Sequence, residues 1–293
     1  MLHLELTAVS IIIISVACRP LEQPEKRQFL IRVALVSAAG WITEESCILL
    51  YGFYAYNPKW SLFLADLPLL VIVVWPLVVI SAWELASQIL HPGHRLVPLA
   101  AGGIVLTDAL FVETVSVQSG LWSWNEPGIF NVPPIGVFGW ACFAFLFILI
   151  FEEGKRRNVT KWYYLRALLF PVIGTHAMLL SIWWGIFRWI NIPVDPKIAT
   201  GSAWAVSLFL IYAILKHRTG THVEKNILLL RLPAAIFFFT LLALNARESA
   251  LLVVFGIAFA APYLTLMAQQ YLIESSPEAS GSRLAEIKNG EKN

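Results

Sequence analysis

Nine apolar runs divide the chain, and they constrain its fold more than any other feature of the sequence. A transmembrane helix needs about 17–25 consecutive, predominantly apolar residues. The runs cover residues 4–18, 29–51, 64–90, 96–117, 135–151, 165–187, 198–215, 226–244 and 249–272. We therefore predict an all-α protein, in which a polytopic bundle of transmembrane helices forms a single integral membrane domain over residues 1–274.

The number of spans is nine or eight. Run 4–18 is short for a span, and run 64–90 is long and is interrupted by Pro68 and Pro76. Nine is the count that we predict, and eight stays open. After the last run, residues 275–293 are polar and charged, which is typical of a mobile tail outside the membrane.

The distribution of Lys and Arg predicts how the bundle is oriented. The loops after the first, third, fifth and seventh runs, together with the tail, hold fourteen Lys and Arg, whereas the other four loops hold four. The cytoplasmic loops of membrane proteins carry the excess of these residues. We therefore expect the amino terminus outside and the carboxyl terminus, with its polar tail, in the cytoplasm.

The composition excludes several classes of function. Only 14% of the residues are charged, against about 25% in soluble proteins. The net charge of +2 gives no basis for a nucleic-acid partner. The three cysteines are isolated within apolar runs, which indicates buried, inert thiols. The sequence also lacks a P-loop, a dinucleotide fingerprint and a nucleophile elbow.

Four of the carboxylates within the apolar runs are candidates for function, and they lie in the half of the bundle that we expect to face outward. They are Glu44, Glu45, Asp108 and Glu113. Ionisable side chains are costly in hydrocarbon and mark either function or pairing. Glu44 and Glu45 are about 100° apart on a helix, so at most one of them points squarely into the bundle. Glu113 lies about 140° around the helix from Asp108, the deepest of the four, so these two do not share a face.

Three histidines are candidates for ligands. His176 lies alone in an apolar run, where a histidine is more often a hydrogen-bonded core residue than a ligand. His91 and His94 have a spacing that can bind a metal, but Pro92 and Gly93 break the helix that would hold them. We therefore predict no metal site.

Aromatic residues cluster beside the carboxylates. Segment 51–56 contains Tyr54 and Tyr56, and Trp122 and Trp124 follow the run that holds two of the acids. One interpretation is a belt of aromatic side chains at the membrane interface. The other is a wall that contacts a flat, conjugated or polyprenyl ligand. Both interpretations stay open on the sequence alone.

Two blocks of sequence combine acids, glycines and aromatic residues in a recognisable order. The first has Glu44-Glu45, Tyr51-Gly52-Phe53-Tyr54-Ala55-Tyr56, Leu67-Pro68-Leu69 and Trp75, and the second has Asp108, Gly120-Leu121-Trp122-Ser123-Trp124, Gly128, Val132-Pro133 and Gly139-Trp140. Over residues 40–150, the chain thus resembles the carotenoid biosynthesis membrane proteins, which include bisanhydrobacterioruberin hydratases and carotenoid 1,2-hydratases of the same type. It departs from their pattern at Glu113-Thr114, where the family has Asp-Pro, and at Gly136, where the family has Asn.

The resemblance implies an integral enzyme of a bacterial or archaeal cytoplasmic membrane, which adds water to a terminal C=C bond of a membrane-dissolved polyene. In this interpretation Asp108 donates a proton to the alkene, and Glu44 or Glu45, with Glu113, orients the water. The candidate substrate-binding residues are Tyr54, Tyr56, Trp75, Trp122, Trp124, Trp140 and His176. The expected partners are the polyene or isoprenoid ligand and membrane lipids, and no cofactor is expected.

Two other functions stay open. The carboxylates of a proton- or cation-coupled transporter could relay charge, but the chain has no internal repeat and no matching pair of broken helices. A non-catalytic membrane scaffold or lipid-binding paralogue is compatible with the altered family positions. If the chain is an enzyme, the class that we expect is a carotenoid hydratase-like lyase.

Deleting the gene distinguishes these functions. For a hydratase, we expect the carotenoid composition of the cells to change, as measured by pigment chromatography. A normal carotenoid profile together with altered uptake of ions or solutes would favour the transporter. If neighbouring genes for carotenoid synthesis are absent, the non-catalytic scaffold becomes the favoured function.

Overall fold

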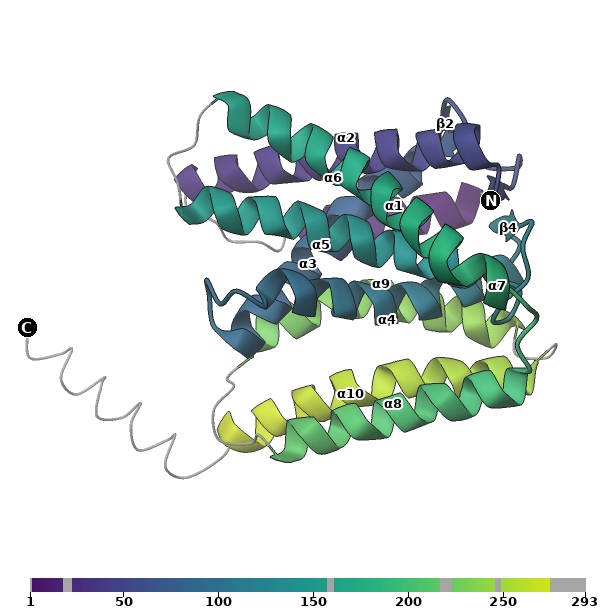
Figure 1. Cartoon of the computed structure of the whole chain (residues 1–293). Helices are drawn as coiled ribbons and strands as arrows, with labels where there is room; N and C mark the ends of the chain where they lie inside the picture. Colours follow the sequence, from purple (N-terminus) through teal and green to yellow (C-terminus); the bar gives the residue numbers. More distant parts are fainter. Residues whose placement is uncertain (1, 18–22, 157–160, 217–222, 246–248, 275–293) are drawn as a thin grey trace, which may run out of the picture.

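The computed structural model describes residues 2–17, 23–156, 161–216, 223–245 and 249–274. Nine long helices lie side by side in this part of the chain (Figure 1). They are α1 (Leu2–Ala17), α2 (Gln23–Tyr51), α3 (Leu69–Leu90), α4 (Val97–Gln118), α5 (Pro134–Arg156), α6 (Lys161–Ile182), α8 (Pro196–Lys216), α9 (Lys225–Asn245) and α10 (Ala250–Glu274). After α6 the chain continues through a π-helical turn, η1 (Trp183–Phe187), into the short α7 (Arg188–Ile190).

Eight helices in the described residues are long and apolar enough to cross a membrane, by length and composition. The remaining long helix, α1, has 16 residues and is not among these eight. The all-α membrane bundle is thus confirmed. The amino end of α1 and the carboxyl end of α10 lie at opposite ends of the bundle (Figure 1). Which end faces the cytoplasm stays a prediction, and the polar tail 275–293 lies outside the described residues.

One expected span begins later than its apolar run. The run 64–90 becomes helical only at Leu69, because Phe63–Leu64 (β2) and Leu67–Pro68 (β3) pair in a short antiparallel hairpin. Pro76, in contrast, lies inside α3 without ending it. The first apolar residues of the run therefore belong to a turn at the end of the bundle and not to the helix.

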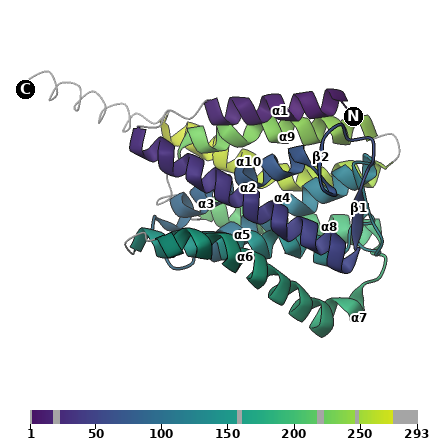
Figure 2. The same ribbon diagram turned by 90° about the horizontal axis from the view of Figure 1, so that it is seen from above.

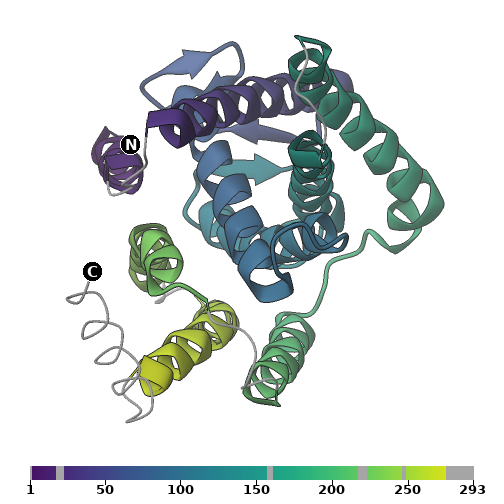
Figure 3. The same cartoon turned by 90° about the vertical axis from the view of Figure 1, so that its left-hand side faces the viewer.

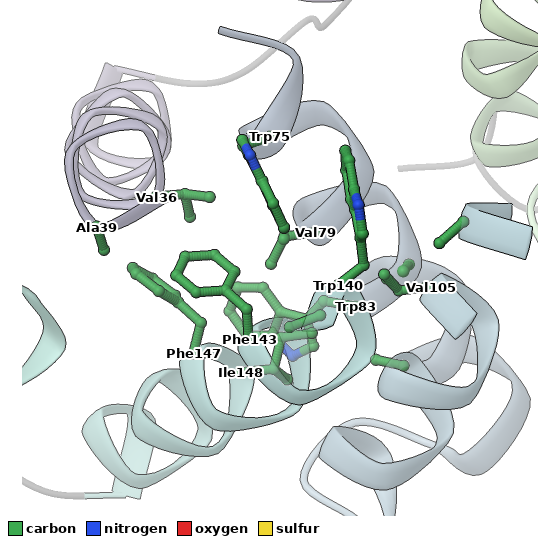
Figure 4. Close-up of a cluster of buried hydrophobic side chains, with 14 of the residues drawn as sticks. Val36, Ala39, Trp75, Val79, Trp83, Val105, Trp140, Phe143, Phe147 and Ile148 are labelled. Carbon is green, nitrogen blue, oxygen red and sulfur yellow. The ribbon is translucent and has the colours of Figure 1, made fainter. Parts of the chain in front are cut away.

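The core of the bundle is formed by α2, α3, α4 and α5 (Figure 4). Phe143, Phe147 and Ile148 of α5 have no exposed surface. They belong to one apolar cluster with Val36 and Ala39 of α2, Trp75, Val79 and Trp83 of α3, and Val105 of α4. Gly102 lets α4 approach α5 closely, because a β-carbon at this position would lie 3.3 Å from the Ala141 carbonyl oxygen.

The remaining helices surround this core less tightly. Figure 3 shows α8, α9 and α10 together on one side of the core, and α1 lies beside α9 and against α3 (Figure 2). They expose large apolar side chains, such as Phe209 of α8 and Leu244 of α9. Lipid tails are as apolar as these side chains, so such faces are expected of helices that lie in a membrane.

A polar cluster inside the bundle joins the peripheral helices to the core. Asp108 of α4 forms an ion pair with Arg231 of α9 and accepts a hydrogen bond from the Tyr263 hydroxyl of α10 at 2.8 Å. Arg231 also donates to Ser81 Oγ of α3 at 2.9 Å. Both charges are therefore paired and hydrogen-bonded, as buried charges generally are. Because four helices contribute to the cluster, it fixes α9 and α10 against α3 and α4.

Two connections at one end of the bundle pair with each other. Tyr54–Tyr56 (β1) follows α2, Trp122–Trp124 (β4) follows α4, and the two strands are antiparallel. Gly52 and Gly120 precede the strands with φ of 59° and 68°, a left-handed conformation that glycine adopts at little cost. We call this end of the bundle the strand end.

Removing one partner of the partly buried ion pair is expected to destabilise the fold. In Arg231→Met, the Asp108 carboxylate stays partly buried without its cation, so we expect the free energy of unfolding to fall by about 3 kcal/mol. Thermal unfolding of the purified protein in detergent measures the loss. The double variant Asp108→Asn/Arg231→Met removes both charges and should recover much of it. A single variant as stable as the wild type would contradict the argument.

Candidate functional site

The β1–β4 pair brings together two aromatic segments that lie far apart in the sequence. Tyr54 lies opposite Trp124, and Tyr56 lies opposite Trp122. The ring centroids of Tyr54 and Trp124 are 4.6 Å apart, and Tyr56 meets Trp122 edge to face at 5.6 Å. The aromatic segments of the two sequence blocks that carry the family resemblance are therefore paired at the strand end.

Glu113, near the end of α4, accepts hydrogen bonds from three indoles and is only 3% exposed. Its Oε2 accepts from Trp122 Nε1 at 2.8 Å and from Trp124 Nε1 at 3.0 Å. Its Oε1 accepts from Trp140 Nε1, on α5, at 2.8 Å. Because an indole N–H can only donate, all three bonds favour the ionised carboxylate and counter the cost of burying it.

Glu44 of α2 is the second buried carboxylate of the site. It is 9% exposed, and its Oε1 accepts a hydrogen bond from the Tyr56 hydroxyl at 2.7 Å. The Tyr54 hydroxyl donates to the backbone oxygen of Glu44 at 3.4 Å. Burial, with the nearby Glu44 carboxylate, raises the pKa of both tyrosines well above the usual value. Both phenols therefore stay protonated donors at neutral and moderately alkaline pH.

Glu44 and Glu113 line the same cavity, which has a volume of about 50 Å³. Eight aromatic residues form about half of its wall, and the remainder consists of the two carboxylates, two glycines, two threonines, a cysteine, an isoleucine and a leucine. The rings come from Phe53, Trp75, Trp122, Trp124, Trp140 and Phe143, among others. A buried water needs roughly 10–15 Å³ of such volume. The cavity therefore has room for a few waters but not for a water together with the end of a polyene.

Close packing positions the indoles around this cavity. Trp75 of α3 stacks on Trp140, with ring centroids 4.0 Å apart and planes at 17° (Figure 4). Gly40 of α2 makes room for Trp75, because a β-carbon there would lie 3.1 Å from the indole. Gly136 likewise makes room for Trp124, whose ring would lie 2.5 Å from an added β-carbon. A larger side chain at Gly136 would displace an indole that bonds to the carboxylate.

The four carboxylates expected from the sequence do not converge. Glu44 and Glu113 share the cavity, whereas Glu45 lies outside its wall and accepts the backbone N–H of Asp66 at 3.1 Å. Asp108 belongs to the polar cluster with α9 and α10. One member of the Glu44–Glu45 pair faces the bundle interior, as helix geometry indicated. Asp108 and Glu113 lie on different faces of α4 for the same reason.

His176 lies between α6 and α2 rather than in the cavity wall. Its Nε2 is 2.8 Å from Ser46 Oγ, and its Nδ1 is 2.8 Å from the Tyr51 hydroxyl. It is therefore a partly buried residue that is hydrogen-bonded between two helices. The other candidate substrate-binding residues all line the cavity, namely Tyr54, Tyr56, Trp75, Trp122, Trp124 and Trp140.

Sequence reasoning missed two residues that the structure makes prominent. Thr175 lies in the cavity wall, but a threonine in an apolar helix carries no signal of function. Arg231 is the lone charged residue of the apolar run 226–244, and such a charge indicates a buried partner. The sequence therefore indicates that Arg231 has a partner, although it does not identify Asp108 as that partner.

Comparison with known proteins identifies a family. A family model described as carotenoid biosynthesis protein matches residues 3–199, which is more than half of the chain. No curated protein and no solved structure matches the chain. The matched range contains every element that lines the cavity, from α2 to α6. It is also the family that the two sequence blocks resemble.

Replacing Glu113 is expected to destabilise the strand end. In Glu113→Leu, three indole N–H groups lose their acceptor, and each buried unsatisfied donor costs about 1–3 kcal/mol. We expect a lower midpoint of thermal unfolding in detergent and an altered tryptophan fluorescence spectrum. Glu45→Leu is the matched control, because this carboxylate lies outside the cavity wall. If the two variants unfold at the same temperature, the argument fails.

Proposed function

The chain belongs to the carotenoid biosynthesis protein family, and we propose that this membrane protein is an enzyme that adds water to a terminal C=C bond of a membrane-dissolved polyene. The observation that carries the proposal is one small cavity with aromatic walls that two buried carboxylates, Glu44 and Glu113, both line. Hydration of an alkene needs a proton donor, a water molecule and stabilisation of positive charge. The cavity supplies groups for each of these needs.

Glu44 is the proton donor in this proposal. Tyr56 donates to its Oε1 at 2.7 Å, which leaves Oε2 to carry the acid proton. Burial favours the neutral form of a carboxylic acid, and a nearby negative charge on Glu113 favours it further. A neutral acid in a low-dielectric site is the form that protonates a weak base such as an alkene.

Glu113 is the fixed negative charge of the proposed site. Its three indole donors favour the ionised form. It therefore stabilises the positive charge that develops on the substrate once a proton has been added. The faces of the stacked Trp75 and Trp140 rings add cation–π attraction to the same carbocation.

The proposed reaction balances without a redox cofactor. The Glu44 proton adds to one alkene carbon, and the other alkene carbon becomes a tertiary carbocation. The oxygen of a water molecule then bonds to this carbon, and the surplus proton of that water returns to the Glu44 carboxylate. The product is a tertiary alcohol, and the enzyme regains its starting protonation state.

The sequence suggested Asp108 as the proton donor, but we assign this role to Glu44 for a physical reason. Asp108 is paired with Arg231 and accepts a hydrogen bond from Tyr263. Asp108 also does not line the cavity, so it does not reach an alkene that enters there. In the proposal Asp108 instead holds α4 in place, and α4 also carries Glu113.

The dimensions of the substrate class suit this location. An extended carotenoid is about as long as the hydrocarbon core of a bilayer is thick, roughly 30 Å. A molecule that lies along the helices therefore brings one end group to the strand end while its polyene chain stays in hydrocarbon. Since the cavity measures only about 50 Å³, the aromatic wall must move to admit that end group.

Glu44→Gln and Glu45→Gln form a matched pair that tests the proposal. The two carboxylates are adjacent in sequence, but only Glu44 lines the cavity. Each variant is produced in membranes that contain an acyclic carotenoid with terminal C=C bonds, and the alcohol is measured by chromatography and mass spectrometry. We expect the wild type and Glu45→Gln to form the alcohol, and Glu44→Gln to form it at least about 100-fold more slowly.

Two results would contradict the proposal. If the wild type forms no alcohol from any acyclic carotenoid tested, the chain is not a hydratase. If Glu44→Gln is as active as Glu45→Gln, Glu44 is not the proton donor. Immunoblotting of the membranes ensures that all three proteins are compared at equal amounts.

A further inference from the structure

Two polar atoms in the cavity wall have no hydrogen-bond partner among the described residues. They are Nε1 of Trp75 and Oγ1 of Thr175. The two residues are only 2% and 1% exposed. A buried polar group without a partner costs about 1–3 kcal/mol. Two such groups around one cavity therefore point to a polar ligand that completes their hydrogen bonds.

Thr175 differs from the other threonines in the described helices. In a helix, a threonine hydroxyl can donate to the carbonyl oxygen three or four residues earlier. Thr7, Thr43, Thr107, Thr114, Thr200, Thr240 and Thr265 all do so. The Thr175 hydroxyl makes no such bond and borders the cavity instead. It is therefore free to bond to a molecule inside the cavity.

Trp75 offers a second hydrogen-bonding group to the same space. Its N–H lies near the Glu44 carboxylate and favours the ionised form as a weak hydrogen-bond donor, but the contact does not have the geometry of a full hydrogen bond. The Trp75 ring itself is held by stacking on Trp140. Its N–H is thus a fixed donor beside the proposed proton donor.

Water is the ligand that fits this arrangement. A buried water needs two to four polar partners and roughly 10–15 Å³ of space. The cavity, of about 50 Å³, offers an N–H donor, a hydroxyl that can donate or accept, and a carboxylate. Resting on the proposed function, we infer that Trp75 and Thr175 hold the water molecule that attacks the carbocation.

The chemistry of the three partners orients this water. The Trp75 N–H donates to one lone pair of the water oxygen, which leaves the other lone pair for the carbocation. The water protons point to the Thr175 oxygen and, once Glu44 has given up its proton, to the Glu44 carboxylate. The attacking oxygen and the proton acceptor are thereby in place before the carbocation forms.

A loss of this water changes the fate of the carbocation rather than its formation. A carbocation that meets no water returns a C–H proton to the Glu44 carboxylate and becomes an alkene again. In D2O, the Glu44 carboxyl group carries deuterium, so this return leaves deuterium in the recovered polyene. The ratio of alcohol to deuterated polyene therefore measures how well the water is positioned, independently of the amount of folded enzyme.

Two variants of different chemistry test the inference in membranes that contain the full-length protein. Thr175→Val keeps the shape of the side chain and removes the hydroxyl, and Trp75→Phe removes the N–H. We expect each to lower the ratio of alcohol to deuterated polyene by about tenfold, the effect of one hydrogen bond. Thr175→Ser restores the hydroxyl and should restore most of the ratio.

Matched controls come from groups outside the cavity. Trp41 has a buried N–H without a partner but does not line the cavity, so Trp41→Phe should leave the ratio unchanged. Thr265 bonds to its own helix, so Thr265→Val should do the same. An unchanged ratio in both Thr175→Val and Trp75→Phe would overturn the inference alone. A wild type that forms neither alcohol nor deuterated polyene would overturn the proposed function and the inference with it.

Discussion

The hydrogen bonds from three indoles to the Glu113 carboxylate are the interaction on which the rest of the site depends. The donors come from β4 and α5, so one side chain near the end of α4 positions tryptophans from two other elements. Strand β4 pairs with β1, and Tyr56 of β1 donates in turn to Glu44. A single acid thus organises the wall beside which the second acid lies.

The length of the apolar runs predicted the helices well, because the thickness of hydrocarbon sets the length of a span whatever its neighbours are. Helix geometry also separated Glu44 from Glu45, since that argument needs only the angle between adjacent residues. No local pattern reveals which helix a buried charge faces. The partner of Asp108 lies 123 residues later in the chain, and the unusual hydroxyl of Thr175 is evident only beside the packed wall. The partners of the buried polar groups could therefore be identified only from the structure.

The two departures from the family pattern have a common physical explanation in Trp124. Thr114, in place of proline, keeps a backbone N–H within α4, and its hydroxyl donates to the Leu110 carbonyl oxygen of the same helix. The longer glutamate side chain at Glu113 reaches Trp124 Nε1. Gly136, in place of asparagine, leaves the space that the Trp124 ring fills. The two departures therefore suit each other, since both accommodate one indole.

The ion pair between Asp108 and Arg231 also bears on how related chains diverge. The family match ends at residue 199, so α9 and α10 lie beyond the matched range. These two helices nevertheless supply the cation and the hydroxyl donor that pair with Asp108, which lies within the matched range. These two helices expose large apolar side chains, such as Leu244 and Leu264, and such positions can take other apolar residues. Asp108 on α4 and Arg231 on α9 cannot change independently, because either one alone would be an unpaired charge in an apolar environment. Among homologues they are expected to be gained and lost together.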